Sequence, residues 1–246
     1  AHFSRLVLPA DLAADQAWVL ARALPLLQAM VDVAASVGWL APALAAMELS
    51  QMAVQAVWEG RDPLVKQVPH LALQTARDMR VDSVFDIMDM EDADRARLLA
   101  GLSPPQVAEV AAYVNRYPSI EAEHVVEGGV TAGAEVAVAL SMSREVDDDD
   151  DDDGEAPGPV IAPFFPYSKS EGWWAVVGDP QTQTLLVVKR IAVGRSLATR
   201  LVFAAPETPG PRKFKLYLMC DAYLGCDQEL DVDVDVQPAA DESDGE

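Results

Sequence analysis

Two hydrophobic periods divide the chain near Pro118. Before that point, apolar residues recur every three to four positions, which is the spacing of an amphipathic helix. After it, apolar and polar residues alternate, as they do in strands with one buried face. The proline-rich stretch that opens Gly158–Asp179 leads into the first central strand. The pattern predicts an α+β chain whose helices come first.

Residues 1–68 are predicted to be the C-terminal part of a helical bundle. Leu12–Val37 places apolar residues at helical spacing, and Gly38 ends the run. Pro25 lies inside this stretch, and an interior proline costs a helix about 3 kcal/mol. We therefore expect a kink there, or two shorter helices. A further helix is predicted over Ala43–Trp58.

Residues 69–117 are predicted to form a helix-loop-helix domain of short helices. In its clearest local signal, Ser103 caps a helix, Pro104 takes the first helical position and Gln106 completes a capping box. This helix should end at Tyr117. The turns of the domain carry the acidic residues Asp82, Asp86, Asp89, Glu91 and Asp92. Their charge argues against a grip on nucleic-acid phosphates at these turns.

Residues 118–238 are predicted to form a seven-stranded β-sandwich of the immunoglobulin-like (fibronectin III-like) class. Its strands are expected at Ile120–Val126, Ala134–Met142, Gly172–Val177, Thr184–Val193, Thr199–Ala204, Lys213–Met219 and Glu229–Val236. In the last of these, valines alternate with aspartates. The valines should face the core and the aspartates the solvent.

Two adjacent tryptophans open the first central strand. Neighbouring side chains on a strand point to opposite faces, so only one of Trp173 and Trp174 should enter the core while the other looks outward. A buried strand tryptophan often centres a two-sheet fold. Trp173 is also a candidate for contact with a partner.

The charge of the chain is unevenly distributed. The 246 residues carry a formal net charge of −22, much of it in the run Asp147–Asp153 and in the tail. Residues 147–157 are predicted to form an extended acidic loop, and residues 239–246 a disordered acidic tail. Ser243 in that tail is a candidate for phosphorylation. Acidic surfaces repel phosphate backbones, so direct RNA contact would need a local basic patch.

Hydropathy indicates a globular chain without a membrane segment. The longest charge-free run of the apolar N-terminal region, Val33–Met47, has fifteen residues, whereas a bilayer needs roughly 20. Cys220 and Cys226 fit neither a disulfide framework nor a zinc spacing, which favours a reducing compartment, the cytosol or the nucleus. Because the chain begins at Ala1 and enters a helical pattern almost at once, we expect it to be a piece of a longer protein.

The sequence predicts no catalytic, cofactor-binding or metal-binding residue. It contains no P-loop, His-Glu-x-x-His, Gly-x-Ser-x-Gly, Cys-x-x-Cys or Gly-x-Gly-x-x-Gly motif. His2, His70 and His124 lie in three separate segments, and nothing pairs them with a nucleophile. We interpret them as ordinary surface or interface histidines.

Basic residues gather modestly on the predicted strands, at Lys189, Arg190, Arg195 and Arg200. No aromatic residues interleave with them as they would in an RNA-binding platform. Two interpretations stay open, a solvated sheet face and a protein-binding edge.

Several long strings resemble one region of the large U5 snRNP RNA helicases of the spliceosome, which are Ski-two-like DExH helicases. They are GWLAPALAAMELSQM (Gly38–Met52), SVFDIMDMEDADRARLL (Ser83–Leu99), QVAEVAAYVNRYPSIE (Gln106–Glu121), the segments of Gly158–Asp179 and LYLMCDAYLGCDQE (Leu216–Glu229). In that family the region is the C-terminal Sec-sixty-three-homology unit, which consists of a helical bundle, a helix-loop-helix domain and an immunoglobulin-like domain.

The resemblance implies a parent that uses ATP and Mg²⁺ to unwind the U4/U6 snRNA duplex during pre-mRNA splicing in the nucleus. In such a parent this stretch is a non-catalytic regulatory and protein-interaction module. Its partners would be other domains of the helicase and spliceosomal proteins, with no membrane. No catalytic residue of the family falls within it.

Two alternatives stay open beside this interpretation. The chain could be an RNA-contacting accessory domain, with Arg95 and Arg97 as contacts, in a sister helicase of transcription-coupled repair or meiosis. It could also be the homology unit of an endoplasmic-reticulum translocation factor. The aspartate run that starts at Asp147 departs from the shorter loop of the family.

Overall fold

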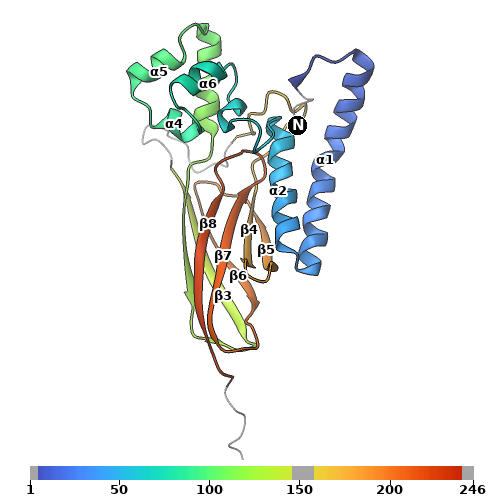
Figure 1. Ribbon diagram of the computed structural model, residues 1–246, viewed down its shortest axis with the longest axis vertical. Coiled ribbons are helices and arrows are strands. Elements are labelled where there is room, and N and C mark those ends of the chain that lie inside the picture. Colours follow the sequence, from blue (N-terminus) through green and yellow to red (C-terminus); the bar gives the residue numbers. More distant parts are fainter. Residues whose placement is uncertain (1–4, 146–157, 240–246) are drawn as a thin grey trace, which may run out of the picture.

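The structure, a computed structural model, describes residues 5–145 and 158–239 and is α+β (Figure 1). Its helices are α1 (Ala10–Val37), α2 (Leu40–Gln55), the 3₁₀ helix η2 (Leu64–Gln67), α3 (Leu73–Asp78), α4 (Val84–Met88), α5 (Asp92–Leu98) and α6 (Pro104–Arg116). Its strands are β1 (Ile120–Glu127), β2 (Val130–Thr131), β3 (Glu135–Arg144), β4 (Trp173–Asp179), β5 (Thr184–Ile191), β6 (Ser196–Ala204), β7 (Gly210–Cys220) and β8 (Gln228–Gln237). Each predicted strand overlaps one of these, and only the short β2 was not expected.

The strands form two sheets that face each other. One has the order β1-β3-β6 and the other β2-β8-β7-β4-β5. Neighbouring strands are antiparallel, except that β2 pairs in parallel with the end of β8. Between the sheets, Phe203 of β6 meets Phe214 of β7 edge-on, with ring centroids 5.6 Å apart. The main core of the molecule lies here.

Strand β8 follows the predicted alternation. Val232, Val234 and Val236 are buried, and the aspartates between them are exposed. Along most of its length β8 pairs only with β7, because β2 covers just its last residues. The charged outer face of β8 is therefore exposed to solvent, while the valines on its inner face fill the core.

Helices α1 and α2 cover the outer face of the five-stranded sheet (Figure 1). Val31 of α1 and Met47 of α2 share a core cluster with Trp174 and Val176 of β4. Each of these four side chains is at most 2% exposed. Strand β4 is thus buried on both faces, by the other sheet on one side and by the two helices on the other, whereas the outer face of β8 stays exposed.

The turn between α1 and α2 joins the sheet through its backbone. Gly38 ends α1 with φ at 76°, a left-handed conformation that favours glycine. The Leu40 N–H donates to Gln183 O at 3.1 Å, and the Leu185 N–H donates to Gly38 O at 2.8 Å. These bonds fix the helical pair at the β4–β5 turn.

The expectation that one tryptophan of β4 looks outward is wrong. Trp173 lies in the core between the sheets at 0% exposure, and Trp174 lies under the helices at 2%. The two side chains do point to opposite faces, as strand geometry requires. The sequence pattern did not indicate that α1 and α2 would cover the second face. Trp173 consequently exposes no side-chain surface to a partner.

The expected division of this stretch into two shorter helices at Pro25 is also wrong. α1 is continuous over its 28 residues with Pro25 inside it. A proline in a helix removes one backbone hydrogen bond and crowds the preceding turn. Pro25 lies on an exposed part of α1, where water can satisfy the freed carbonyl group.

Helices α3 to α6 lie above one end of the two sheets (Figure 1). The predicted capping box at the start of α6 is confirmed, with Gln106 Oε1 accepting from the Ser103 backbone N–H at 2.9 Å. A second capping box, between Ser83 and Asp86, begins α4. The Ser-x-x-Asp spacing of Ser83 and Asp86 is present in the sequence. The sequence analysis considered Asp86 only as one of the acidic residues of the turns.

Candidate functional site

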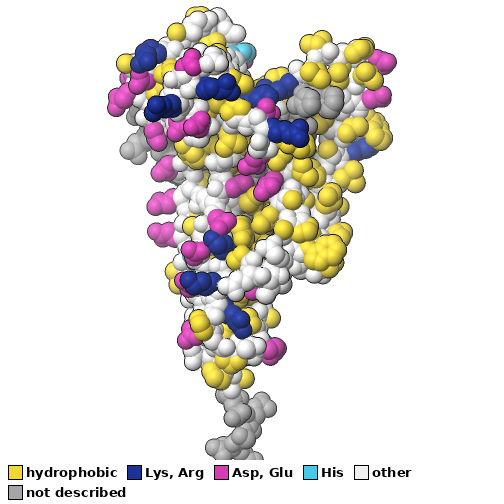
Figure 2. Space-filling model, in the orientation of Figure 1, with side chains coloured by type: hydrophobic (Ala, Val, Ile, Leu, Met, Phe, Trp, Pro, Cys, Tyr) yellow, Lys and Arg dark blue, Asp and Glu magenta, His cyan; other side chains and the backbone are white. Residues whose placement is uncertain are grey.

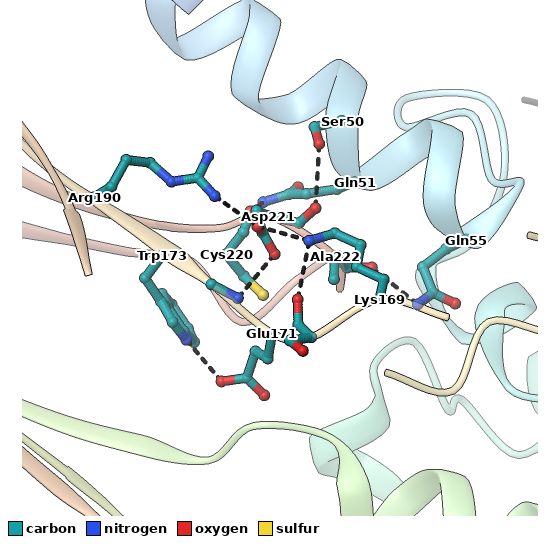
Figure 3. Close-up of polar contacts among 12 residues, drawn as sticks. Ser50, Gln51, Gln55, Lys169, Glu171, Trp173, Arg190, Cys220, Asp221 and Ala222 are labelled. Atoms are coloured by element: carbon teal, nitrogen blue, oxygen red, sulfur yellow. Dashed lines mark hydrogen bonds and ion pairs between the residues drawn. The ribbon is translucent and has the colours of Figure 1, made fainter. Parts of the chain in front are cut away.

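The most elaborate polar arrangement among the described residues surrounds the connection between β7 and β8, residues 221–227. This connection lies where α2, α6, the segment before β4 and the ends of the sheet meet (Figure 3). We call it the junction. Its side chains are nearly all buried.

Asp221 is the charged centre of the junction and is 1% exposed. Its Oδ2 lies 2.7 Å from Lys169 Nζ and 3.0 Å from a guanidinium nitrogen of Arg190. Its Oδ1 accepts the backbone N–H of Gly172 at 3.0 Å (Figure 3). A buried carboxylate is tolerated when such partners replace its lost hydration. The arrangement ties β5 and the segment before β4 to the end of β7.

A second buried acid, Glu171, joins the two sheets. Its Oε1 accepts the indole N–H of Trp173 at 2.8 Å and also pairs with Arg144 of β3. Its side chain is 2% exposed and that of Arg144 is 13% exposed. Trp173, predicted as a partner contact, is thus held inside the core by a hydrogen bond.

Helix α2 docks on the junction through three polar side chains on its otherwise apolar face. Ser50 donates to Asp221 O at 3.2 Å, Gln51 to Cys220 O at 2.7 Å and Gln55 to Ala222 O at 2.9 Å. Gln67, which follows on η2, exchanges two hydrogen bonds with the backbone of Leu224. These side chains satisfy carbonyl groups that the sheet leaves unpaired, as buried backbone groups require.

Asp227 lies at the other end of the connection and is short of positive partners. Its carboxylate accepts Gln51 Nε2 at 2.7 Å and the Cys220 N–H at 2.7 Å. Burial, together with the nearby carboxylates of Glu59 and Glu48, nevertheless raises the pKa of Asp227 from 3.8 to about 7, although those hydrogen bonds lower it. Part of the Asp227 population is therefore protonated at neutral pH.

Three tyrosines link α6 to the junction. The Tyr113 and Tyr117 rings each meet Tyr223 edge-on, with centroids 5.8 and 5.5 Å apart. The Tyr117 hydroxyl donates to Leu224 O at 2.7 Å. Burial raises the pKa of all three phenols above the usual value, so their hydroxyl groups stay neutral. The Tyr223 hydroxyl accepts the backbone N–H of Ile161 at 3.0 Å.

Cys226 of the junction and Cys220 directly before it are buried, and both are free thiols. Burial also raises the pKa of the Cys226 thiol. A thiol held neutral in this way is a poor nucleophile. Within the described residues, no group of three or more His, Cys, Asp or Glu side chains is placed to hold a metal ion. The hydrogen bonds and ion pairs of the junction connect α2, the C-terminal end of α6, the segment before β4 and the sheet.

The basic residues predicted as an interaction patch do not form one cluster. Arg190 stacks over the Trp174 ring at 4.4 Å while it binds Asp221. Lys189 reaches across to the other sheet and donates to Thr199 Oγ1 at 2.6 Å. Arg200 pairs with Glu127 on the outer face of the three-stranded sheet.

The remaining predicted site residues are exposed, or lie outside the described ranges. Arg195 is exposed in the turn between β5 and β6. Arg95 pairs with Asp92 at 3.2 Å, and Arg97 with Asp94 at 2.6 Å. Ser243 and the Asp147–Asp153 run lie outside the residues that the structure describes.

One surface that the sequence analysis missed is the outer face of α1. Only Val31 and Ala34 of this helix are buried. Its large apolar side chains that are more than half exposed are Leu12, Trp18, Val19, Leu26, Met30, Val33 and Val37. Figure 2 shows hydrophobic side chains along much of this helix. Exposed apolar surface of this extent marks an interaction site.

The exposed residues of α1 repeat at intervals of seven. Leu12, Val19, Leu26 and Val33 form one row, and Met30 and Val37 belong to a neighbouring row. Two such rows, three and four residues apart, are the seam that one helix offers to another in a coiled coil or bundle. We call these six side chains the α1 seam.

By length and composition, α1 could also cross a membrane. The expectation that the chain has no such segment rested on Val33–Met47, a stretch that the turn at Gly38 divides between two helices. The candidate span is instead α1, which begins before this stretch, at Ala10. The core helix of a soluble protein and a signal sequence meet the same criterion, so one such helix is weak evidence for a membrane span.

The fold and the junction define a two-sheet α+β module with two helices packed on its larger sheet. The Sec63 Brl domain matches residues 1–233. The chain therefore belongs to the Sec63 Brl domain family.

Several proteins similar to the chain are helicases. The chain is 44% identical over 251 aligned positions to the U5 small nuclear ribonucleoprotein 200 kDa helicase of Drosophila melanogaster, and likewise to that of Homo sapiens, covering 100% of the chain. The DExH-box ATP-dependent RNA helicase DExH12 of Arabidopsis thaliana is 42% identical over 96% of the chain. The chain spans 11% of the length of each of these relatives.

More distant similarities add little. An activating signal cointegrator 1 complex subunit 3-like protein of Dictyostelium discoideum is 37% identical over 93% of the chain and 10% of its own length. Among solved structures, a CARDB domain from Pyrococcus furiosus covers 49% of this chain and 90% of its own, at 13% identity and a TM-score of 0.30. That TM-score is too low to support an argument.

Proposed function

We propose that the chain is a non-catalytic regulatory and protein-interaction module of a spliceosomal ATP-dependent RNA helicase that unwinds U4/U6 snRNA in the nucleus. Its similarity to U5 helicases over the full chain supports this, as does the lack of nucleotide-binding motifs in its sequence. ATP and Mg²⁺ would be used by other parts of that helicase, and spliceosomal proteins would be among the partners.

The α1 seam is the observation that carries the proposal. A heptad row of exposed Leu and Val would be unfavourable in water, at roughly 25 cal/mol for each Å² of apolar surface. A helix from another domain of the same helicase would cover it by knobs-into-holes packing. The chain covers 11% of the relative from Drosophila melanogaster, which is therefore about nine times as long. The rest of such a helicase could supply this helix. This use of α1 explains its hydropathy without a membrane.

The proposed architecture has three parts. Residues 1–68 complete a helical bundle, residues 69–117 form a helix-loop-helix domain, and residues 118–238 form an immunoglobulin-like, seven-stranded sandwich. The α1 seam supports the first assignment, because a bundle needs further helices against it. The two facing antiparallel sheets support the third. The junction would hold the three parts in one arrangement.

The alternative of RNA contact through Arg95 and Arg97 has less support. Both guanidinium groups bind neighbouring aspartates, and Arg95 also donates to the carbonyl groups of Met88 and Met90. A sister helicase is less favoured because the signal-cointegrator relative is the more distant one, at 37% identity against 44%. A translocation factor is disfavoured because the similar proteins named above are helicases, apart from one subunit of a signal cointegrator complex.

Charge substitution in the α1 seam of the intact helicase tests the proposal. Leu26→Lys should lower unwinding or the response to spliceosomal partners, because it places a charge in a packed helical interface. Ala21→Lys is the matched control, since Ala21 is exposed on the opposite side of the same helix. Equal behaviour of the two variants would overturn the assigned role of α1. ATP turnover by residues 1–246 alone would overturn the non-catalytic role.

A further inference from the structure

The outer face of the three-stranded sheet differs from that of the five-stranded sheet. Helices α1 and α2 pack on the five-stranded sheet, whereas they lie away from β1, β3 and β6 (Figure 1). Because β3 turns Val136, Val138 and Leu140 into the core, the residues between them form the outer face. This outer face is a candidate binding surface.

The face forms a trough along its central strand. β3 places only small side chains there, at Ala137, Ala139 and Ser141. Longer side chains rise on both sides, and β-sheet register sets Val125 of β1 and Arg200 of β6 opposite Ala139. The hollow has a volume of about 390 Å³. A shallow groove with a small-residue floor can accept the side chains of a bound segment.

Apolar surface is exposed on both walls of the trough. Val125 is 64% exposed and Val202 is 43% exposed. In a strand facing water, these positions usually carry polar residues. The two valines lie on opposite sides of β3, so a ligand in the trough would cover both.

The β1 wall of the trough is acidic. Glu121, Glu123 and Glu127 alternate along the outer face of β1, and all three are exposed. Arg200 neutralises Glu127. Within the described part of the chain, Glu121 and Glu123 form no ion pair. The open carboxylates therefore favour a positively charged ligand.

We propose that this trough binds a basic segment of a partner protein in which lysine or arginine alternates with apolar residues. The basic side chains meet Glu121 and Glu123, and the apolar ones cover Val125, Ala139 and Val202. RNA and anionic membranes carry the wrong charge for the β1 wall. A second copy of this chain is disfavoured for the same reason, since its net charge is −22. The trough lies apart from the α1 seam, so the two proposals fail independently.

The test uses residues 1–246 and a labelled peptide in which lysine and valine alternate. We expect fluorescence anisotropy to show binding that weakens as salt rises. Amide NMR shifts should fall on β1, β3 and β6. A peptide with glutamate in place of lysine should not bind. Absence of binding by the lysine peptide, or shifts confined to other elements, would overturn the proposal.

Two pairs of variants separate the trough from general charge attraction. Glu123→Lys should weaken peptide binding by about tenfold, whereas Asp233→Lys, the same charge change on the exposed face of β8, should leave it within about twofold. Val125→Ser should weaken it, and Val37→Ser on α1 should not. Equal losses within either pair would contradict the proposal. Oligouridine that binds more tightly than the peptide, or self-association lost in Glu123→Lys, would show that the face serves RNA or a second copy instead.

Discussion

Asp221 and Asp227 stand at the two ends of one buried connection, in very different surroundings. Asp221 faces Lys169 and Arg190, whereas Asp227 faces an amide, a backbone N–H and the field of two other carboxylates. The negative charge of Asp221 is balanced by two positive side chains, whereas Asp227 has no such partner among the described residues that contact it. Two substitutions follow from this contrast.

Replacing Asp221 with alanine should destabilise the fold strongly. The change leaves Lys169, whose side chain is 13% exposed, without its buried counter-charge. Removing one member of such a pair costs about 3–5 kcal/mol in the free energy of unfolding. Urea unfolding measures the change. Asp94→Ala, which breaks the exposed pair with Arg97, should cost less than about 1 kcal/mol, and a similar loss in both variants would contradict the account.

Asp227 should make stability fall as pH rises towards neutrality. In the folded chain its pKa is raised from 3.8 to about 7, so between these values the unfolded state binds fewer protons than the folded state. The free energy of unfolding therefore decreases from about pH 4 to about pH 7, by at most about 1.4 kcal/mol per pH unit.

The variant Asp227→Asn isolates this effect. The asparagine side chain does not titrate. The free energy of unfolding of the wild type, relative to that of the variant, should therefore decline between pH 5 and pH 8. Urea unfolding at several pH values in this range gives the difference. A difference that stays constant with pH would show that Asp227 titrates normally.

At the scale of elements, the contact between α2 and β4 is unusually close. A Cβ atom added at Gly178 would lie 2.6 Å from Leu40 Cδ1 and 2.7 Å from Leu40 Cδ2. Leu40 is 1% exposed, so it cannot swing into water. Glycine at this position lets the start of α2 rest directly on the strand.

Gly178→Ala should therefore lower the free energy of unfolding by about 1–3 kcal/mol, through overpacking against Leu40. Thermal or urea unfolding provides the measurement. Gly129→Ala is the control, because nothing lies within 4 Å of a Cβ atom there. In the double variant with Leu40→Ala, the two losses should be less than additive; simple additivity would mean that the predicted clash does not exist.

Patterns among neighbouring residues predicted most helices and strands. They did not predict the contacts between elements that lie far apart in the sequence. The strands, the valine alternation of β8 and the capping box at Ser103 follow from neighbouring residues, so the sequence reveals them. The burial of Trp174 depends on helices more than 120 positions earlier in the chain. No periodicity within its own strand reports that contact.

The junction illustrates the same limit. The string CDAYLGCDQE was informative as part of a resemblance, but its two aspartates gave no hint of their partners. Gln51 and Gln55 carried the clearest available signal, because they are neighbours four positions apart on a largely apolar helix. Such a polar pair on a buried face predicts a buried hydrogen-bonded contact, though not which segment receives it.

At the scale of the whole molecule, we propose that the chain is a protein-interaction module. Its α1 seam is covered by a helix from another domain in the intact helicase. The α2 face already lies against the sheet, while most of α1 does not. The two helices should therefore respond differently when the rest of the helicase is present.

Hydrogen exchange of the α1 amides, measured in residues 1–246 alone and in the intact helicase, tests this claim most directly. Exchange in α1 should slow markedly in the intact protein because a packed helix opens less often, whereas exchange in α2 should change little. Leu26→Lys in the intact helicase should restore the faster α1 exchange, and Ala21→Lys should not. Equal α1 exchange rates in the chain alone and in the intact helicase would contradict the account.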